Sequence, residues 1–262
     1  MDLGLKNKVI VVSGGAKGIG EAIVKLLAAE HAIPVILGRN DKDNLRVVGE
    51  IESLGGKAFQ VIAELSDPVS CELAIKKVLE KFNRIDGLVN NAGVNDGVGL
   101  ENGNYQKFMA SLHTNVVHYY LLAHYVLPEL IKSKGAIVNI ASKTAITGQG
   151  NTSAYAASNG GRIALTREWA VELLKYDIRV NAVIVSESYT PAYEKWIETL
   201  PNPQEKLKEI ESKIPLGNRM TKPEEIANAV AFLLSSKSSH TTGQLVYVDG
   251  GYVHLDRALA NA

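Results

Sequence analysis

Three features are scarce in this sequence, and each scarcity excludes a class of protein. The 262 residues include one cysteine, Cys71, so an internal disulfide is excluded and a reducing compartment is expected. Lysine plus arginine and aspartate plus glutamate each number 28, and the formal net charge is zero. The chain therefore lacks the basic field that draws in nucleic acids. No apolar run approaches the roughly 20 residues of a membrane span.

The first residues also lack the apolar stretch and cleavage site of a secretory signal. Together these absences predict a cytoplasmic protein with neither a nucleic acid nor a membrane as partner. The histidines His113, His118 and His124 do not have a spacing typical of metal ligands, so no metal is expected.

Short apolar runs rich in β-branched residues alternate with amphipathic segments along the chain. Such runs are typical of strands buried on both faces of a parallel sheet. The predicted strands are residues 9–12, 34–37, 57–62, 85–89, 136–140, 178–184 and 245–248. The predicted helices are one that follows residue 20, then 41–54, 67–82, 105–131, 153–175 and 224–234. The alternation predicts an α/β fold: a doubly wound, Rossmann-like parallel sheet of about seven strands with helices on both faces.

No linker or repeat divides the sequence, so residues 1–262 are expected to form a single domain. The segment at about 186–216 follows the sixth predicted strand and contains four prolines. It is long for a connection between two elements, which predicts a lid over a functional site.

A glycine-rich segment, residues 13–20, joins the first predicted strand to the first helix. Its glycines Gly14, Gly18 and Gly20 let the backbone approach a pyrophosphate, and the helix start, with Ile19, offers N–H donors. The alternative is a tight turn that binds nothing. The order strand, glycine loop, helix favours a dinucleotide site.

The tip of the second predicted strand carries Arg39, and the glycine loop carries Lys17. The end of this strand normally meets the adenosine ribose, and two cations there favour a 2′-phosphate. NADP is therefore expected, with NAD as the alternative. Arg39 can instead be a solvated side chain, because Asp41 lies close in sequence.

Several motifs in a fixed order resemble the short-chain dehydrogenases/reductases over essentially the whole chain. The motifs are Gly14, Gly18 and Gly20, then Asn90, Asn91, Ala92 and Gly93, then Asn115, Ser142 and Tyr155, and finally residues 248–251. The resemblance implies one dinucleotide-binding oxidoreductase domain, commonly assembled as a homotetramer. The segments 91–96, 142–152, 165–169 and 254–259 are similar to the bacterial L-fucose dehydrogenase branch, whose members oxidise the anomeric hydroxyl of free aldose sugars to a lactone.

The resemblance also implies roles for individual residues. Tyr155 would exchange a proton with the substrate oxygen and Ser142 would orient that oxygen, with Asn115 as a further catalytic position. Asn91, Ala92, Gly93 and Thr190 would contact the cofactor. The family usually has a lysine four residues after the tyrosine, whereas this chain has Asn159. An amide can still hold the nicotinamide ribose, but it supplies no charge.

A free phenol ionises only near pH 10, so a tyrosine base needs a nearby cation. Three interpretations of Asn159 follow: an enzyme that recruits another cation, an enzyme active mainly at alkaline pH, or a non-catalytic protein that binds a sugar or dinucleotide. Arg162 is the candidate replacement, since it lies seven residues beyond Tyr155 on the same helical face. The alternative is that Arg162 points to solvent or to a subunit interface.

Polar residues near the expected nicotinamide pocket favour a sugar, because unpaired hydroxyls are costly to bury. Asn95, Gln149 and Glu187 are the candidates for hydroxyl contacts, and Trp196 and His254 for contacts with the sugar ring. The aromatic side chains can instead serve packing. Another small alcohol or ketone remains the alternative substrate.

Overall fold

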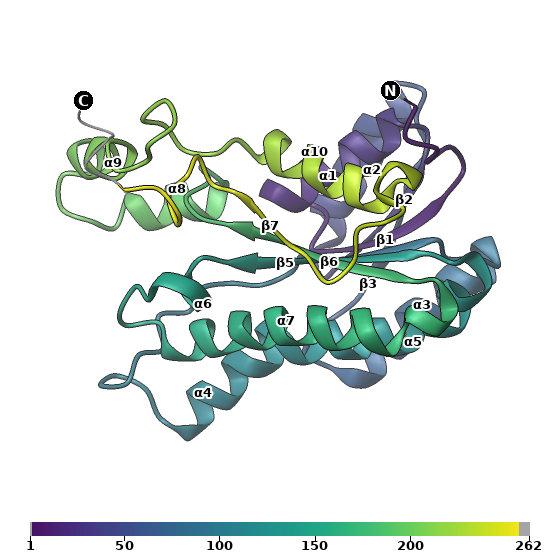
Figure 1. The fold of residues 1–262 in the computed structure, drawn as a ribbon, viewed down its shortest axis with the longest axis horizontal. Helices are drawn as coiled ribbons and strands as arrows, with labels where there is room; N and C mark the ends of the chain where they lie inside the picture. The colour runs from purple at the N-terminus through teal and green to yellow at the C-terminus, as the bar shows by residue number, and fades with distance from the viewer. Residues whose placement is uncertain (1, 257–262) are drawn as a thin grey trace.

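The computed structural model describes residues 2–256 and places one parallel sheet between two layers of helices (Figure 1). The strands are β1 (Val9–Ser13), β2 (Ile33–Gly38), β3 (Phe59–Ile62), β4 (Gly87–Asn90), β5 (Ala136–Ser142), β6 (Arg179–Val185) and β7 (Leu245–Val248). Their order is β3-β2-β1-β4-β5-β6-β7, and every neighbouring pair is parallel. The predicted doubly wound fold is confirmed.

Helices cover both faces of the sheet, which explains why the central strands β1, β4, β5 and β6 are buried at nearly every position. The helices on one face are α1 (Gly18–Ala29), α2 (Asp41–Ser53) and α10 (Pro223–Leu234), and those on the other are α3 (Pro68–Phe82), α5 (His118–Ser133) and α7 (Ser153–Glu172). Each face has its own apolar core. None of the helices in residues 2–256 is long and apolar enough to cross a membrane.

The strand order reverses between β1 and β4, which lie side by side. Parallel sheets bind ligands in the crevice at the carboxyl ends of the strands, at such a point of reversal. The glycine loop follows β1, residues 91–93 follow β4, and Ser142 ends β5. The topology therefore gathers the predicted motifs at one edge of the sheet.

The connection after β6 contains two short helices, α8 (Pro191–Ile197) and α9 (Pro203–Glu211). They project beyond the carboxyl ends of β5 to β7, at the left of Figure 1. On the opposite layer, α6 (Thr144–Thr147) directly follows β5. The C-terminal part of one sequence motif, residues 257–259, lies outside the described residues.

The stretch predicted as one helix over residues 105–131 is helical throughout, and it contains a π-turn. It consists of α4 (Tyr105–Leu112), the π-helical turn η1 (His113–Val117) and α5. A π-turn widens the helix and removes the usual backbone partner of a carbonyl, and such turns occur often at functional sites. Apolar periodicity continues across the turn, so the sequence pattern does not reveal it.

Candidate active site

The glycine loop forms a narrow cradle at the start of α1. A Cβ atom on Gly20 would collide with the Gly14 carbonyl and the Asn91 side chain, so only glycine fits there. Lys17, the residue that precedes α1, makes no side-chain cap hydrogen bond. The first backbone N–H groups of α1 therefore keep their capacity to bind an anion, and the loop fits the pyrophosphate of a dinucleotide.

The turn after β4 is fastened to this loop. The Asn91 side-chain amide donates to the carbonyls of Ser13, at 3.0 Å, and Gly14, at 3.2 Å. The Ser13 hydroxyl accepts from the backbone N–H groups of Asn91, at 2.9 Å, and Ala92, at 3.1 Å. Thr190 lies close to the glycine loop: a Cβ atom built on Gly18 would lie 3.2 Å from the Thr190 side chain.

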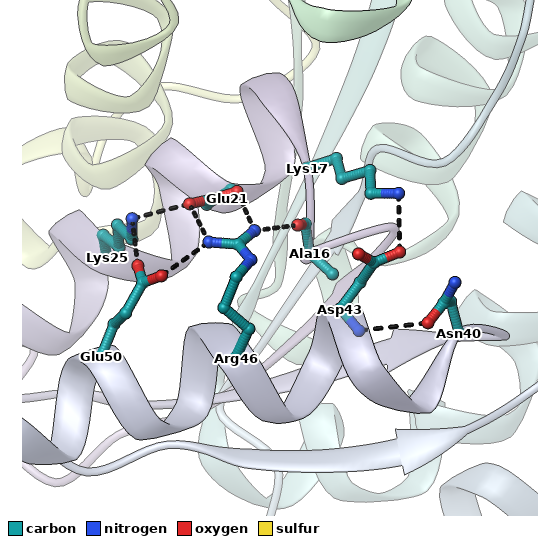
Figure 2. Close-up of polar contacts among 8 residues, drawn as sticks. All are labelled: Ala16, Lys17, Glu21, Lys25, Asn40, Asp43, Arg46 and Glu50. Carbon is teal, nitrogen blue, oxygen red and sulfur yellow. Dashed lines mark hydrogen bonds and ion pairs between the residues drawn. The ribbon is translucent and has the colours of Figure 1, made fainter.

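Charged side chains surround the predicted adenosine end of the cradle (Figure 2). Lys17 Nζ lies 2.6 Å from an Asp43 carboxylate oxygen. Arg39 lies 3.6 Å from Glu64, and the Arg39 side chain is 81% exposed. Both predicted cations thus have carboxylate partners, although Arg39 is held only loosely.

Arg46 on α2 is a residue of this region that sequence reasoning missed. Its guanidinium donates to the Ala16 carbonyl at 3.0 Å and to Glu21 at 2.7 Å, and it also pairs with Glu50 at 2.8 Å (Figure 2). Arg46 therefore ties α2 to the glycine loop. The four-residue spacing of Arg46 and Glu50 is visible in the sequence, but the facing of the two helices is not.

The predicted catalytic residues come from three neighbouring elements. Ser142 ends β5 and Tyr155 lies in the first turn of α7, both partly exposed, whereas Asn115 in η1 and Asn159 in α7 are fully buried. The Ser142 hydroxyl accepts from the Thr144 N–H at 3.3 Å, which leaves its own O–H to donate. The serine hydroxyl and the tyrosine phenol are therefore the groups able to reach a ligand.

Asn159 is occupied by protein partners. Its amide nitrogen donates to the Tyr155 carbonyl at 2.8 Å, and its amide oxygen accepts from Arg162 at 3.1 Å. The amide keeps one further N–H and one further lone pair, but the residue is fully buried, so a cofactor role of Asn159 stays a prediction. The alternative that Arg162 points to solvent is wrong, because its side chain lies inside the protein and the residue is 2% exposed.

A buried ion pair next to Ser142 was also missed by sequence reasoning. The Lys143 ammonium pairs with the Glu187 carboxylate, and it lies 4.1 Å from the centroid of the Tyr252 ring. Burial, and then the nearby Glu187, raise the pKa of Tyr193 well above its ordinary value. The sequence shows only that Lys143 and Glu187 follow the ends of two predicted strands, and the register that brings them together, with Ser142 opposite Val185, appears in the structure.

The other predicted substrate residues lie farther out. Asn95 is exposed and its side chain accepts from the Gly97 N–H at 3.2 Å, and Gln149 lies exposed in the loop after α6. Trp196 on α8 is 45% exposed and packs edge-on against Tyr193, with ring centroids 5.0 Å apart.

Two further residues have partners within the chain. His254 packs edge-on against Tyr247, with ring centroids 4.3 Å apart. The Thr190 hydroxyl accepts from the Tyr193 N–H at 3.3 Å and so caps α8. Across residues 2–256, His, Cys, Asp and Glu side chains form no group of three that could hold a metal ion.

Comparison with known proteins places this geometry in a family. Residues 14–253 match the model of the family described as enoyl-(acyl carrier protein) reductase. A 3-oxoacyl-[acyl-carrier-protein] reductase, FabG, of Thermotoga maritima is 40% identical over 95% of this chain and 99% of its own length. L-Fucose dehydrogenase of Bos taurus is 32% identical over 94% of this chain and 89% of its own. The crystal structure of Cj0485 dehydrogenase superposes with a TM-score of 0.94 at 47% identity, covering 99% of both chains.

Proposed function

Because the chain belongs to the short-chain dehydrogenase/reductase family of NAD(P)-dependent oxidoreductases, we propose that it oxidises a free aldose sugar. The sugar is L-fucose-like, the reaction occurs at the anomeric carbon, and the product is a lactone. NADP is the proposed cofactor, and when bound it accepts the hydride.

The observation that carries the sugar proposal is the buried Lys143–Glu187 pair next to Ser142. Besides the bond that they share, the ammonium and the carboxylate have further hydrogen-bonding positions, which substrate hydroxyls can fill and an alkyl chain or steroid cannot. Tyr252, whose ring lies 4.1 Å from the Lys143 ammonium, and Tyr193, close to Glu187, place aromatic rings beside the pair. The relative named L-fucose dehydrogenase adds support.

Within this proposal the chain's own residues perform two tasks. Tyr155 removes the proton of the anomeric hydroxyl, and Ser142 donates a hydrogen bond to the same oxygen. The glycine loop and the Asn91–Gly93 turn hold the dinucleotide against them, since the two segments are hydrogen-bonded to each other.

The substrate test is a panel of free sugars with NAD and with NADP, followed by the absorbance of the reduced nicotinamide. Reduction of an acetoacetyl thioester belongs in the same panel, because the identity to FabG favours a 3-oxoacyl substrate as the second candidate. Turnover of L-fucose with NADP above all other combinations is expected. Thioester reduction without sugar oxidation would contradict the sugar proposal, and tight sugar binding without turnover would favour a non-catalytic binder.

Replacement of Arg39 with aspartate is expected to shift cofactor preference from NADP towards NAD. Arg39 is exposed, and its contact with Glu64 is long, at 3.6 Å. Its guanidinium can therefore turn towards a 2′-phosphate. A charge-assisted hydrogen bond contributes about 1.5–3 kcal/mol, so NADP affinity should fall roughly 10- to 100-fold. The measurement is the Kd of each dinucleotide. Lys42→Asp, the same charge change at an exposed position of α2, is the matched control. An equal loss of NADP affinity in both variants would show that the change in net charge, and not a contact of Arg39, causes the effect.

Replacement of Gln149 with alanine is expected to raise the KM for the sugar about 2- to 10-fold, the worth of one hydrogen bond. Cofactor affinity should stay unchanged, because Gln149 lies after α6, away from the glycine loop. Gln106→Ala, an exposed glutamine on α4, is the control. An unchanged KM would remove Gln149 from the proposed sugar site.

A further inference from the structure

The Arg162 guanidinium is a buried cation surrounded by neutral oxygen atoms. The residue is 2% exposed. It donates to the carbonyls of Asn115 at 2.7 Å, Ile140 at 3.2 Å and Ala92 at 3.3 Å, and to the side-chain oxygens of Asn159 at 3.1 Å and Asn115 at 3.5 Å. Among residues 2–256, no carboxylate forms an ion pair with it.

A buried charge without a counter-ion is expensive, and an arginine does not escape the cost by losing its proton. Dipoles of carbonyl groups offset part of this cost. The site therefore favours a negative charge nearby, either on a bound ligand or on an ionised side chain.

The titratable groups packed against Arg162 from α5 do not supply that negative charge. The guanidinium lies 4.3 Å from the Tyr119 ring centroid, and the Tyr119 hydroxyl donates to the same Ile140 carbonyl at 2.9 Å. Burial raises the pKa of Tyr119. Burial, and then the Arg162 charge, lower the pKa of His118 to about 3. Both groups are thus neutral near pH 7. Lys143 and Glu187, beyond β5, already form a pair.

On α7 itself, the titratable side chain that shares a face with Arg162 is Tyr155. Residues 155, 159 and 162 recur at four- and three-residue spacing, so they share one face of α7. Asn159 joins its two neighbours, because its amide oxygen accepts from Arg162 and its nitrogen donates to the Tyr155 carbonyl. The hydrogen bonds run from the guanidinium through Asn159 to the main-chain carbonyl of Tyr155, and the phenol projects from the same face of the helix.

The π-turn η1 and the turn after β4 also contact the guanidinium. Asn115 lies in the π-turn η1, and its carbonyl accepts from Arg162 Nε. A Cβ atom on Gly93 would lie 2.5 Å from Arg162 Nη2, so the turn that faces the cofactor accommodates the arginine only with glycine at that position.

We propose that Arg162 is the positioning residue that supplies the fixed positive charge of this active site. It holds the Asn159 amide, the Ala92 carbonyl and the Asn115 carbonyl in place, and its charge stabilises the Tyr155 phenolate. The site has room for one cation, because an ammonium introduced at position 159 would lie against the guanidinium, 3.1 Å from the present amide oxygen. This role rests on Tyr155 acting as the base and not on the identity of the substrate.

The test is a set of four variants: Arg162→Gln, Arg162→Lys, Asn159→Lys and the double variant Asn159→Lys with Arg162→Gln. The ultraviolet absorbance of phenolate is titrated in each, and the same variant with Tyr155→Phe is subtracted to isolate Tyr155. Arg162→Gln is expected to move the Tyr155 titration to higher pH by at least about one unit, because a stabilising cation is lost. Arg162→Lys should move it less.

The double variant gives the sharper result. Asn159→Lys alone should lower the thermal stability, since it places two cations side by side. With Arg162→Gln added, stability should recover and the Tyr155 titration should return towards that of the unmodified protein, because one cation is again present. Oxidation rates measured against pH should follow the titrations, with the alkaline rise moving in the same direction in each variant.

Two outcomes would overturn the proposal. One is an Arg162→Gln protein with lowered thermal stability but an unmoved Tyr155 titration, which assigns Arg162 a structural role alone. The other is a folded double variant in which Tyr155 titrates at least one unit above the unmodified protein; this comparison holds even where Arg162→Gln alone does not fold. The titration needs no substrate, so failure of the sugar panel leaves it unaffected.

Discussion

Replacement of Tyr155 with phenylalanine is expected to lower kcat by about 10²- to 10⁴-fold, the range that a positioned general base contributes. The change removes one hydroxyl from a partly exposed side chain at the start of α7. The Tyr155 carbonyl, which accepts from Asn159, is retained. Thermal stability and dinucleotide affinity should therefore change little while turnover is lost.

The measurements are the steady-state rate, the Kd for the dinucleotide and the unfolding temperature. Tyr105→Phe, which removes a hydroxyl from a tyrosine that is 73% exposed on α4, is the control and should keep full activity. Turnover that survives Tyr155→Phe would contradict the proposal that Tyr155 is the general base. If dinucleotide affinity falls together with turnover, the main role of the Tyr155 hydroxyl is to bind the cofactor.

Replacement of Lys143 with methionine is expected to destabilise the protein by about 3–5 kcal/mol, because it leaves the Glu187 carboxylate buried without its partner. The two side chains are 8% and 13% exposed, so water cannot compensate fully for the loss. For a chain of this length the unfolding temperature should fall by roughly 10 °C. Sugar affinity should fall as well if the pair binds substrate hydroxyls.

A double variant, Lys143→Met with Glu187→Leu, separates the two effects. Removing both charges should restore most of the stability, since an apolar pair can replace a buried ion pair at little cost. Sugar affinity should not recover. An affinity that returns with the stability would show that the pair serves packing alone.

The exposed pair Lys134–Asp177 is the matched control, with side chains 68% and 70% exposed. Lys134→Met should cost no more than about 1 kcal/mol, because water already solvates both groups. A comparable loss of stability in the two single variants would contradict the distinction between buried and exposed pairs on which the prediction rests.

Local patterns in the sequence were sufficient to predict the fold and the places of the main motifs. Strands covered on both faces are nearly continuous apolar runs, so β1, with all five residues buried and four of them apolar, is recognisable without a structure. Gly14, Gly18 and Gly20 are required by backbone geometry, which is also a local property. The candidate roles of Ser142 and Tyr155 came from the resemblance of the motif order to that of the family.

Tertiary structure alone decided which polar groups meet. Lys143 and Glu187 belong to different strand ends and pair only because β5 and β6 are neighbours in register. Arg46 reaches Ala16 only because α2 packs beside α1.

The same holds for Arg162. The sequence places it on the face of Tyr155, but burial of its charge depends on carbonyls that come from β5, from η1 and from the turn after β4. Periodicity reports which side of an element is apolar, because that property repeats along the chain. The partner of a buried charge comes from a distant segment, so the sequence pattern around the charge does not contain it.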